Sequence, residues 1–292
     1  MKWLGGLAVV VVIAIAVFLV NLIWFRPWSL NLFYEKVFAE VVFDHPELLS
    51  TLGLVEQFGL TSHNGKLDDE SPTHQEREFD RWKRDLTQLR QYSLARQSAS
   101  QKLSTHVLEW FLQVQVEGEK WQWHNYPVNQ LFGVQNQVPS FMANTHRLLN
   151  RKDCEYYLKR LDGLPKKFDQ ILEGLKIREE KQILPPRFVV EEVLKEMTDF
   201  VGTPVSENIL ASSFKTRAGK IAELTKARHA DFQARVETTI TGKIYPAYQK
   251  LIDYFREILP KTTTDDGVWK LPDGRAFYAH CSREKYNYHV EP

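Results

Sequence analysis

Hydrophobic positions recur at helical spacing along most of the chain. Phe79, Trp82, Leu86 and Leu89 alternate at three and four residues within a charged segment, which predicts an amphipathic helix with one buried stripe. The same pattern predicts a buried stripe on the following helix, formed by Leu103, Val107, Trp110, Phe111 and Val114. Both segments are therefore expected to pack one face on a core and to expose the other.

Further helices are predicted along the rest of the body, where strand patterns are scarce. The segments are 30–43, a short helix from Pro46, 153–161, 165–181, 188–201 and 220–258. A break or kink is expected in the last one at Pro246, because proline removes a helical hydrogen bond and clashes with the preceding turn. The pattern predicts one all-α domain over residues 29–292, formed as a helical bundle.

The N-terminal segment differs from the body, since residues 3–25 contain no charged side chain. At ~1.5 Å per residue this length spans a ~30 Å hydrocarbon core. We therefore expect residues 1–28 to be an uncleaved transmembrane signal anchor, with the lipid bilayer as partner through residues 3–25. The positive-inside rule, applied to Lys2 and Arg26, favours an N-terminus inside a bacterial inner membrane and a periplasmic body.

Composition narrows the classes of function. The chain has 38 basic and 37 acidic residues and a net charge of +1, with no basic stripe, which argues against nucleic acid as a partner. Cys154 and Cys281 lie far apart in the sequence and form no metal-type pair. They are two thiols or, in an oxidising compartment, one disulfide.

Catalytic signatures are missing from the sequence. It has no Gly-rich phosphate loop, no G-x-S-x-G elbow and no clustered Cys/His spacing. The segment from His106 to Trp110, "HVLEW", has a tryptophan where an H-x-x-E-H site needs a second histidine. We therefore predict no catalytic residue, no metal ligand and no cofactor in this chain.

One internal segment, residues 126–142, combines amides with helix-breaking residues. Pro127, Gly133 and Pro139 predict an ordered, non-helical connection. The amides either bond to backbone and fix an irregular path, or face a groove and hold an extended peptide. The candidates for such a substrate groove are Asn129, Gln130, Gln135 and Asn136.

Four blocks in a fixed order carry a resemblance to a known family. They are "YPVNQLFGVQNQVPSFMANTH", "DCEYYLKRLDGLPKKFDQILEGLKI", "ILPPRFVVEEVLKEM" and "LPDGRAFYAHC". From Phe33 to its end the chain resembles the bacterial family filed as domain of unknown function 885. The resemblance implies a gluzincin-like helical fold and a zinc metallopeptidase about twice this length, whose second half carries an H-E-x-x-x-G-H-H-like zinc helix.

The sequence ends shortly after its "LPDGRAFY" block, before that zinc helix would be reached. The resemblance therefore implies a partial gluzincin-like fold and a catalytically incomplete N-terminal half, with zinc expected only in full-length relatives. Its helices would form one wall of a substrate cleft. An exposed apolar face near Phe277, Tyr278, Tyr286 and Tyr288 would then meet the missing C-terminal half or a second copy. The alternative is a complete, membrane-tethered helical module that binds a protein partner.

Overall fold

The computed structural model describes residues 13, 16–18, 20–22 and 25–286, and within these ranges every regular element is a helix. The body is therefore all-α, as its periodicity predicts. The chain divides into two compact units. Unit 1 comprises Met1–Asp44 and Arg77–Glu119, and unit 2 comprises His45–Glu76 and Lys120–Pro292.

The prediction of an N-terminal transmembrane helix is wrong for the part of the chain that the structure describes. No helix there combines the length and the apolar character needed to cross a bilayer. The first labelled helix, α2 (Leu30–Asp44), has only 15 residues and carries Glu35, Lys36 and Glu40. This finding also overturns the predicted single-pass inner-membrane placement. Most of residues 3–25, on which both predictions rest, lies outside the described residues.

Unit 1 is built from α2, the larger part of α4 (Pro72–Leu89) and α5 (Ala99–Gly118). A capping box starts α5, because the Ser98 side chain accepts from the Gln101 backbone and the Gln101 side chain accepts from the Ser98 backbone. The buried core consists of Leu30, Phe33, Val37, Leu86, Leu89 and Leu112. The stripe predicted on α4 is confirmed, with Trp82 partly buried against this core.

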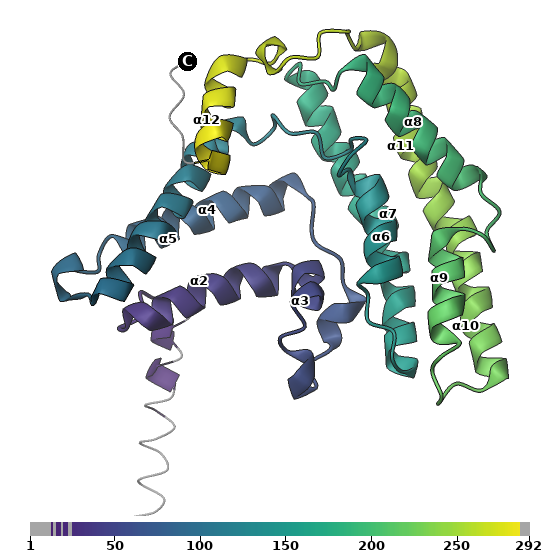
Figure 1. Cartoon of the computed structure of the whole chain (residues 1–292), viewed down its shortest axis with the longest axis horizontal. Helices are drawn as coiled ribbons and strands as arrows, with labels where there is room; N and C mark the ends of the chain where they lie inside the picture. The colour runs from purple at the N-terminus through teal and green to yellow at the C-terminus, as the bar shows by residue number, and fades with distance from the viewer. Residues whose placement is uncertain (1–12, 14–15, 19, 23–24, 287–292) are drawn as a thin grey trace, which may run out of the picture. The chain divides into compact units, whose positions relative to one another are not determined.

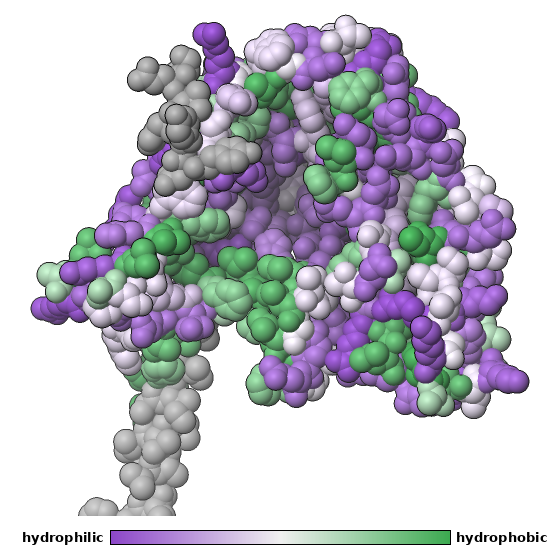
Figure 2. All heavy atoms as spheres, in the orientation of Figure 1, coloured by the Kyte–Doolittle hydropathy of each residue, from purple (hydrophilic) through white to green (hydrophobic). Residues whose placement is uncertain are grey.

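The stripe predicted on α5 is largely wrong. Val114 is buried, but Leu103, Val107 and Phe111 are exposed, and the buried face instead includes Leu112 and Thr105. A polar contact sets this orientation: the hydroxyl of Tyr34 on α2 lies 2.7 Å from Thr105 Oγ1 and donates to the Gln101 carbonyl at 3.0 Å. Apolar residues also gather on the surface over α2 (Figure 2).

Unit 2 holds most of the helices. They are α3 (Pro46–Leu52), α6 (Val134–Asn144), α7 (Arg151–Glu180), α8 (Arg187–Gly202), α9 (Ile209–Ala218), α10 (Lys226–Thr239), α11 (Tyr245–Ile258) and α12 (Gly274–Tyr286). The short 3-10 turns along the chain are η1 (Glu56–Phe58), η2 (Ser62–Gly65), η3 (Leu94–Arg96), η4 (Glu119–Trp121), η6 (Leu259–Lys261) and η7 (Val268–Lys270). The long helix α7 packs against α10 and α11, α8 lies along α11, and α9 lies beside α6 and α10 (Figure 1).

Two prolines lie within long helical segments, and one of them acts differently from the prediction. The helix α7 runs unbroken through Pro165 for 30 residues, whereas two helices were expected. Leu164 and Phe168, which lie on either side of Pro165, are both fully buried. The free energy gained by burying them outweighs the loss of one helical hydrogen bond. At Pro246, where a break or kink is predicted, a π-helical turn, η5 (Ile240–Ile244), interrupts the regular α-helical geometry between α10 and α11. Such a turn widens the helix just before the proline.

The segment 126–142 is only partly non-helical. Residues 126–133 form turns and loop, but α6 begins at Val134 and continues through Pro139 to Asn144. The prediction of a non-helical connection is therefore wrong for its second half. Gly133 precedes the helix, and a Cβ there would lie 2.4 Å from the Asn129 carbonyl oxygen, so the turn requires glycine.

The C-terminal helix packs through one of the predicted aromatic residues. The Phe277 ring lies 4.8 Å from the His124 ring and 5.9 Å from the Trp121 ring, between centroids. Tyr278 is exposed. The Tyr286 side chain and Tyr288 lie outside the described residues. Both cysteines are free, with Cys154 buried and Cys281 half-buried.

Two matched leucine truncations on α5 test the orientation of this helix. Leu112 is 0% exposed and Leu103 is 67% exposed. We expect Leu112→Ala to lower the free energy of unfolding by about 2–5 kcal/mol, because it leaves a cavity in the core of unit 1. Leu103→Ala is expected to change it by less than about 0.5 kcal/mol. Urea denaturation followed by circular dichroism measures both, and equal losses would show that the predicted stripe is buried after all.

Candidate functional site

A buried arginine on α7 organises one end of unit 2. The side chain of Arg160 is among the largest fully buried ones, at 1% exposed. Its guanidinium donates to the Lys66 carbonyl at 2.8 Å and to Ser50 Oγ at 2.6 Å. It also lies over the Phe141 ring, 4.7 Å from the centroid. An unpaired buried charge is costly, so these contacts fix the segment between α3 and α4 on α7.

The third partner of Arg160 is His146, which is completely buried. Arg160 Nη1 donates to His146 Nδ1 at 2.8 Å, so this nitrogen carries no proton. The other ring nitrogen, Nε2, donates to the Asp153 carbonyl at 3.2 Å. Burial and the adjacent Arg160 charge lower the pKa of His146 to about 3. The imidazole is therefore neutral at physiological pH and acts as a hydrogen-bond bridge.

A buried lysine, Lys167, forms a second attachment about two turns further along α7. Lys167 is 3% exposed, and its Nζ lies 2.7 Å from Glu47 Oε1 and 3.0 Å from Glu70 Oε1. Burial disfavours its charge, but Glu70 and Glu47 outweigh this and raise the pKa of Lys167. Asp68 closes the network, because its carboxylate accepts from the Glu47 backbone N–H at 2.9 Å.

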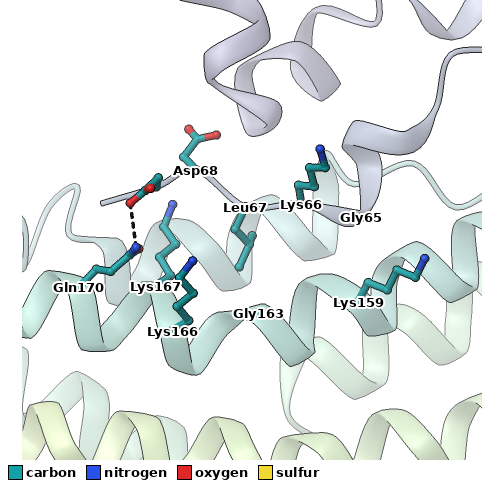
Figure 3. A pocket seen from close by; sticks show the side chains of 10 residues that line it. Gly65, Lys66, Leu67, Asp68, Lys159, Gly163, Lys166, Lys167 and Gln170 are labelled. Atoms are coloured by element: carbon teal, nitrogen blue, oxygen red, sulfur yellow. Dashed lines mark hydrogen bonds between the residues drawn. The ribbon is translucent and has the colours of Figure 1, made fainter. Parts of the chain in front are cut away.

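These attachments leave a pocket of about 160 Å³ between the 65–69 segment and α7, both within unit 2. It is lined by Gly65, Lys66, Leu67, Asp68 and Asp69 on one side and by Lys159, Gly163, Lys166, Lys167 and Gln170 on α7 (Figure 3). Gly65 allows the close approach of the two walls. A Cβ at this position would lie 2.8 Å from the Tyr156 ring.

The carboxylates of this pocket are already engaged by the protein. Asp69 accepts from Gln170 Nε2 at 2.7 Å and from the Ser71 backbone N–H at 3.0 Å. Burial would raise the pKa of Asp69, but the two bonds from Ser71 outweigh it, and the pKa lies below its usual value. For Asp68, burial is likewise outweighed by hydrogen bonds from His45 and the Glu47 backbone, which lower its pKa. Both carboxylates are therefore ionised at neutral pH.

Three lysines of the pocket, unlike its two aspartates, have side chains that are not held by hydrogen bonds or ion pairs within the described part of the chain. Lys66, Lys159 and Lys166 are exposed, and in the described part of the chain none of them forms an ion pair. Lys159 only lies over the Tyr156 ring, 5.5 Å from the centroid. The pocket therefore offers cationic groups to a ligand, while its anionic groups are satisfied internally.

The predicted amide residues gather at a different place, around the start of α6. Asn129 donates to the Tyr126 carbonyl and accepts from the backbone N–H groups of Leu131 and Phe132 at 2.9 and 2.8 Å. Gln135 is buried and donates to the Asn129 carbonyl at 2.7 Å. These bonds fix the irregular path of the segment.

A glutamate from α8 holds the far side of the same loop. Glu196 Oε2 accepts from Asn136 Nδ2 at 2.7 Å and from Gln135 Nε2 at 3.1 Å. Gln130 is half-buried beside them. A contact of these amides with a bound peptide stays a prediction, and the donors of Asn129 and Gln135 are already used within the chain.

Three histidines of unit 2, His63, His124 and His146, do not fit a catalytic zinc, which needs three converging protein ligands. Both ring nitrogens of His146 are bonded, His63 Nε2 lies 2.8 Å from Glu56 Oε1, and His124 Nε2 donates to the Pro272 carbonyl at 2.9 Å. Among the described residues of unit 2, no three His, Cys, Asp or Glu side chains bring their donor atoms within 4.8 Å of one another.

Comparison with protein families gives a match over most of the chain. Residues 46–292 match the family described as "Bacterial protein of unknown function (DUF885)". The chain belongs to this family. The matched region contains all of the pocket and the buried charge network of unit 2.

Among solved structures, the chain is similar to one described as "The crystal structure of the putative lipoprotein from Colwellia psychrerythraea". The two are 17% identical, with a TM-score of 0.73 over 88% of this chain and 47% of that one. This similarity establishes the fold. The chain spans about half the length of that structure. Comparison with curated proteins gives no match.

The pocket was missed by sequence reasoning, although it has a signal. Lys159, Gly163, Lys166 and Gln170 follow at spacings of three and four residues, which places them on one face of α7. Because two helices were expected there, separated before Pro165, this face was not recognised. The opposing wall, residues 65–69, lies outside every helix that the sequence predicts.

Protonation of His146 makes the stability of unit 2 dependent on pH. Its folded pKa of about 3 lies below the ordinary value of 6.5, so the unfolded chain binds the additional proton as the pH falls between them. The stability is fully present above about pH 6.5 and declines by roughly 1.4 kcal/mol per pH unit below it. We expect His146→Gln to lose this part of the acid dependence in urea denaturation between about pH 7 and 4.

The exposed His106 provides the control. His106→Gln should keep the wild-type dependence on pH. A His146→Gln variant whose unfolding free energy declined with pH as steeply as that of the wild type would contradict the assignment.

Proposed function

We propose that this chain is the non-catalytic, peptide-binding helical part of a zinc-metallopeptidase-like protein. The resemblance of its four sequence blocks supplies the class of activity. The family match over residues 46–292 and a similar structure of about twice the length are consistent with this part-protein role.

The observation that carries the proposal is the pocket on α7. Its walls are held by Arg160 and Lys167, which are both buried and both bonded across to the 45–70 segment. Such a preformed cavity binds a ligand without first ordering its own walls. In contrast, His63, His124 and His146 serve as structural hydrogen-bond partners. These features support binding, rather than hydrolysis, as the role that we propose for this region.

A second candidate function is an interaction module for a protein partner. The exposed face of α5, with Leu103, Val107 and Phe111 one turn apart, favours it. Contiguous apolar surface of this kind often marks a protein–protein contact. The partner would be a second copy of the chain or a separate helical chain. Concentration-dependent association in analytical ultracentrifugation, abolished by Val107→Glu, is the result that favours this function.

Metal content and hydrolysis test the proposed absence of catalysis. We expect the purified chain, incubated with zinc and passed through gel filtration, to retain far less than one zinc ion per chain. We also expect it to leave a mixed peptide library uncleaved, because three ligands and an open position for water are needed. A one-to-one zinc complex with chelator-sensitive cleavage would overturn the proposal.

Retention of peptides tests the binding part of the proposal separately. The immobilised chain should retain a subset of the same library, identified by mass spectrometry after washing. If the chain neither cleaves nor retains any peptide, the result would contradict peptide binding and favour the function as an interaction module.

A further inference from the structure

We infer that the pocket on α7 binds the free C-terminal carboxylate of a peptide. This inference rests on the proposed peptide-binding function and names the part of the peptide that is recognised. The groups that recognise the carboxylate are the ammonium groups of Lys66, Lys159 and Lys166, which line the pocket from both walls (Figure 3).

The charge state of the lining selects an anionic group. Asp68 and Asp69 are occupied by the Glu47, Ser71 and Gln170 donors described above. Lys167 is neutralised by two glutamates. The three remaining ammonium groups form no ion pair in the described part of the chain, and an ionised acceptor forms the strongest hydrogen bonds with them.

Size and the position of the aspartates favour a peptide end over a phosphate group. The cavity of about 160 Å³ holds a terminal residue rather than a nucleotide. Two ionised aspartates on the same wall repel a phosphate with two negative charges. A peptide end carries a single negative charge, so the same aspartates repel it less.

The lining also offers an apolar surface next to the lysines. The Leu67 side chain lies over Gly163, where a Cβ on the glycine would be 3.6 Å from Leu67 Cδ1. The lack of a side chain at residue 163 leaves the surface of α7 low between Lys159 and Lys166. The terminal side chain of a peptide would rest on Leu67 while its carboxylate meets the lysines.

A pair of ligands that differ in one group tests the inference. Calorimetric titrations would compare an N-acetylated dipeptide with a free C-terminus to its C-terminal amide, and would use the tightest peptide from the library in both forms. We expect the free acids to bind at least about tenfold more tightly than the amides, because only the acids form charge-assisted bonds. Inorganic phosphate at equal concentration should compete weakly or not at all.

Substitution of two exposed lysines locates the effect. Lys159→Gln with Lys166→Gln should remove the preference for the free acid, and both side chains are exposed, so the fold should persist. Lys220→Gln with Lys226→Gln removes the same charge from exposed positions outside the pocket lining and should retain the preference.

The outcomes separate this inference from the function on which it rests. Equal binding of acid and amide, or an unchanged preference in the pocket variant, would overturn the inference while peptide binding stood. Strong competition by phosphate would reassign the pocket to phosphate groups and likewise overturn it. Lysine-dependent binding of the short acid without retention of any library peptide would keep the carboxylate site and reject the peptide-binding function.

Discussion

The burial of a permanent cation in the middle of α7 is the constraint on which the rest of unit 2 depends. Arg160 cannot lose its charge at physiological pH, so every donor of its guanidinium must find an acceptor inside the fold. The acceptors come from Ser50, the Lys66 carbonyl and His146, which lie far from it in the sequence. One side chain therefore connects α3, the 62–66 turn and the end of α6 to α7.

This constraint also explains the state of the groups around it. Burial disfavours a protonated His146, and protonation would also place a second cation against Arg160, so the pKa of His146 is lowered and its neutral form is held. Lys167 repeats the arrangement about two turns further along α7, with two glutamates in place of neutral acceptors. The pocket lies beside these two attachments and has rigid walls as a result. Unlike Lys167, the other pocket lysines, Lys66, Lys159 and Lys166, form no ion pair within the described part of unit 2.

The sequence predicts those features that depend on local periodicity. The all-α body, the buried stripe of α4, and the helices around Phe168 and over 188–201 follow from apolar spacing, because a single face repeats every three to four residues. Features set by contacts between distant segments could not be predicted in this way. The orientation of α5 depends on a hydroxyl pair between Tyr34 and Thr105, and the continuity of α7 through Pro165 depends on the burial of its neighbours.

The candidate site likewise combines residues that stand out in the sequence with residues that only contacts between distant segments bring together. Amides at 129–136 stand out in the sequence, but the structure uses much of their hydrogen bonding to fix a turn and a contact with Glu196. The lysines of α7 look like an ordinary solvated helix face. These lysines line a pocket only because the 65–69 segment lies over them, and Arg160 holds that segment in place. The zinc chemistry implied by the family resemblance has no matching set of ligands in the described part of unit 2.

Hydrogen exchange of the backbone amides in an Arg160→Lys variant tests most directly whether this arginine holds the pocket together. Lysine keeps the charge but has no planar fork of five donors, so it cannot satisfy the same acceptors. The account predicts that amides of residues 46–70 lose protection, while those of α8 and α11 keep most of theirs. Unchanged protection in residues 46–70 would contradict the central role of Arg160, as would an equal loss throughout unit 2.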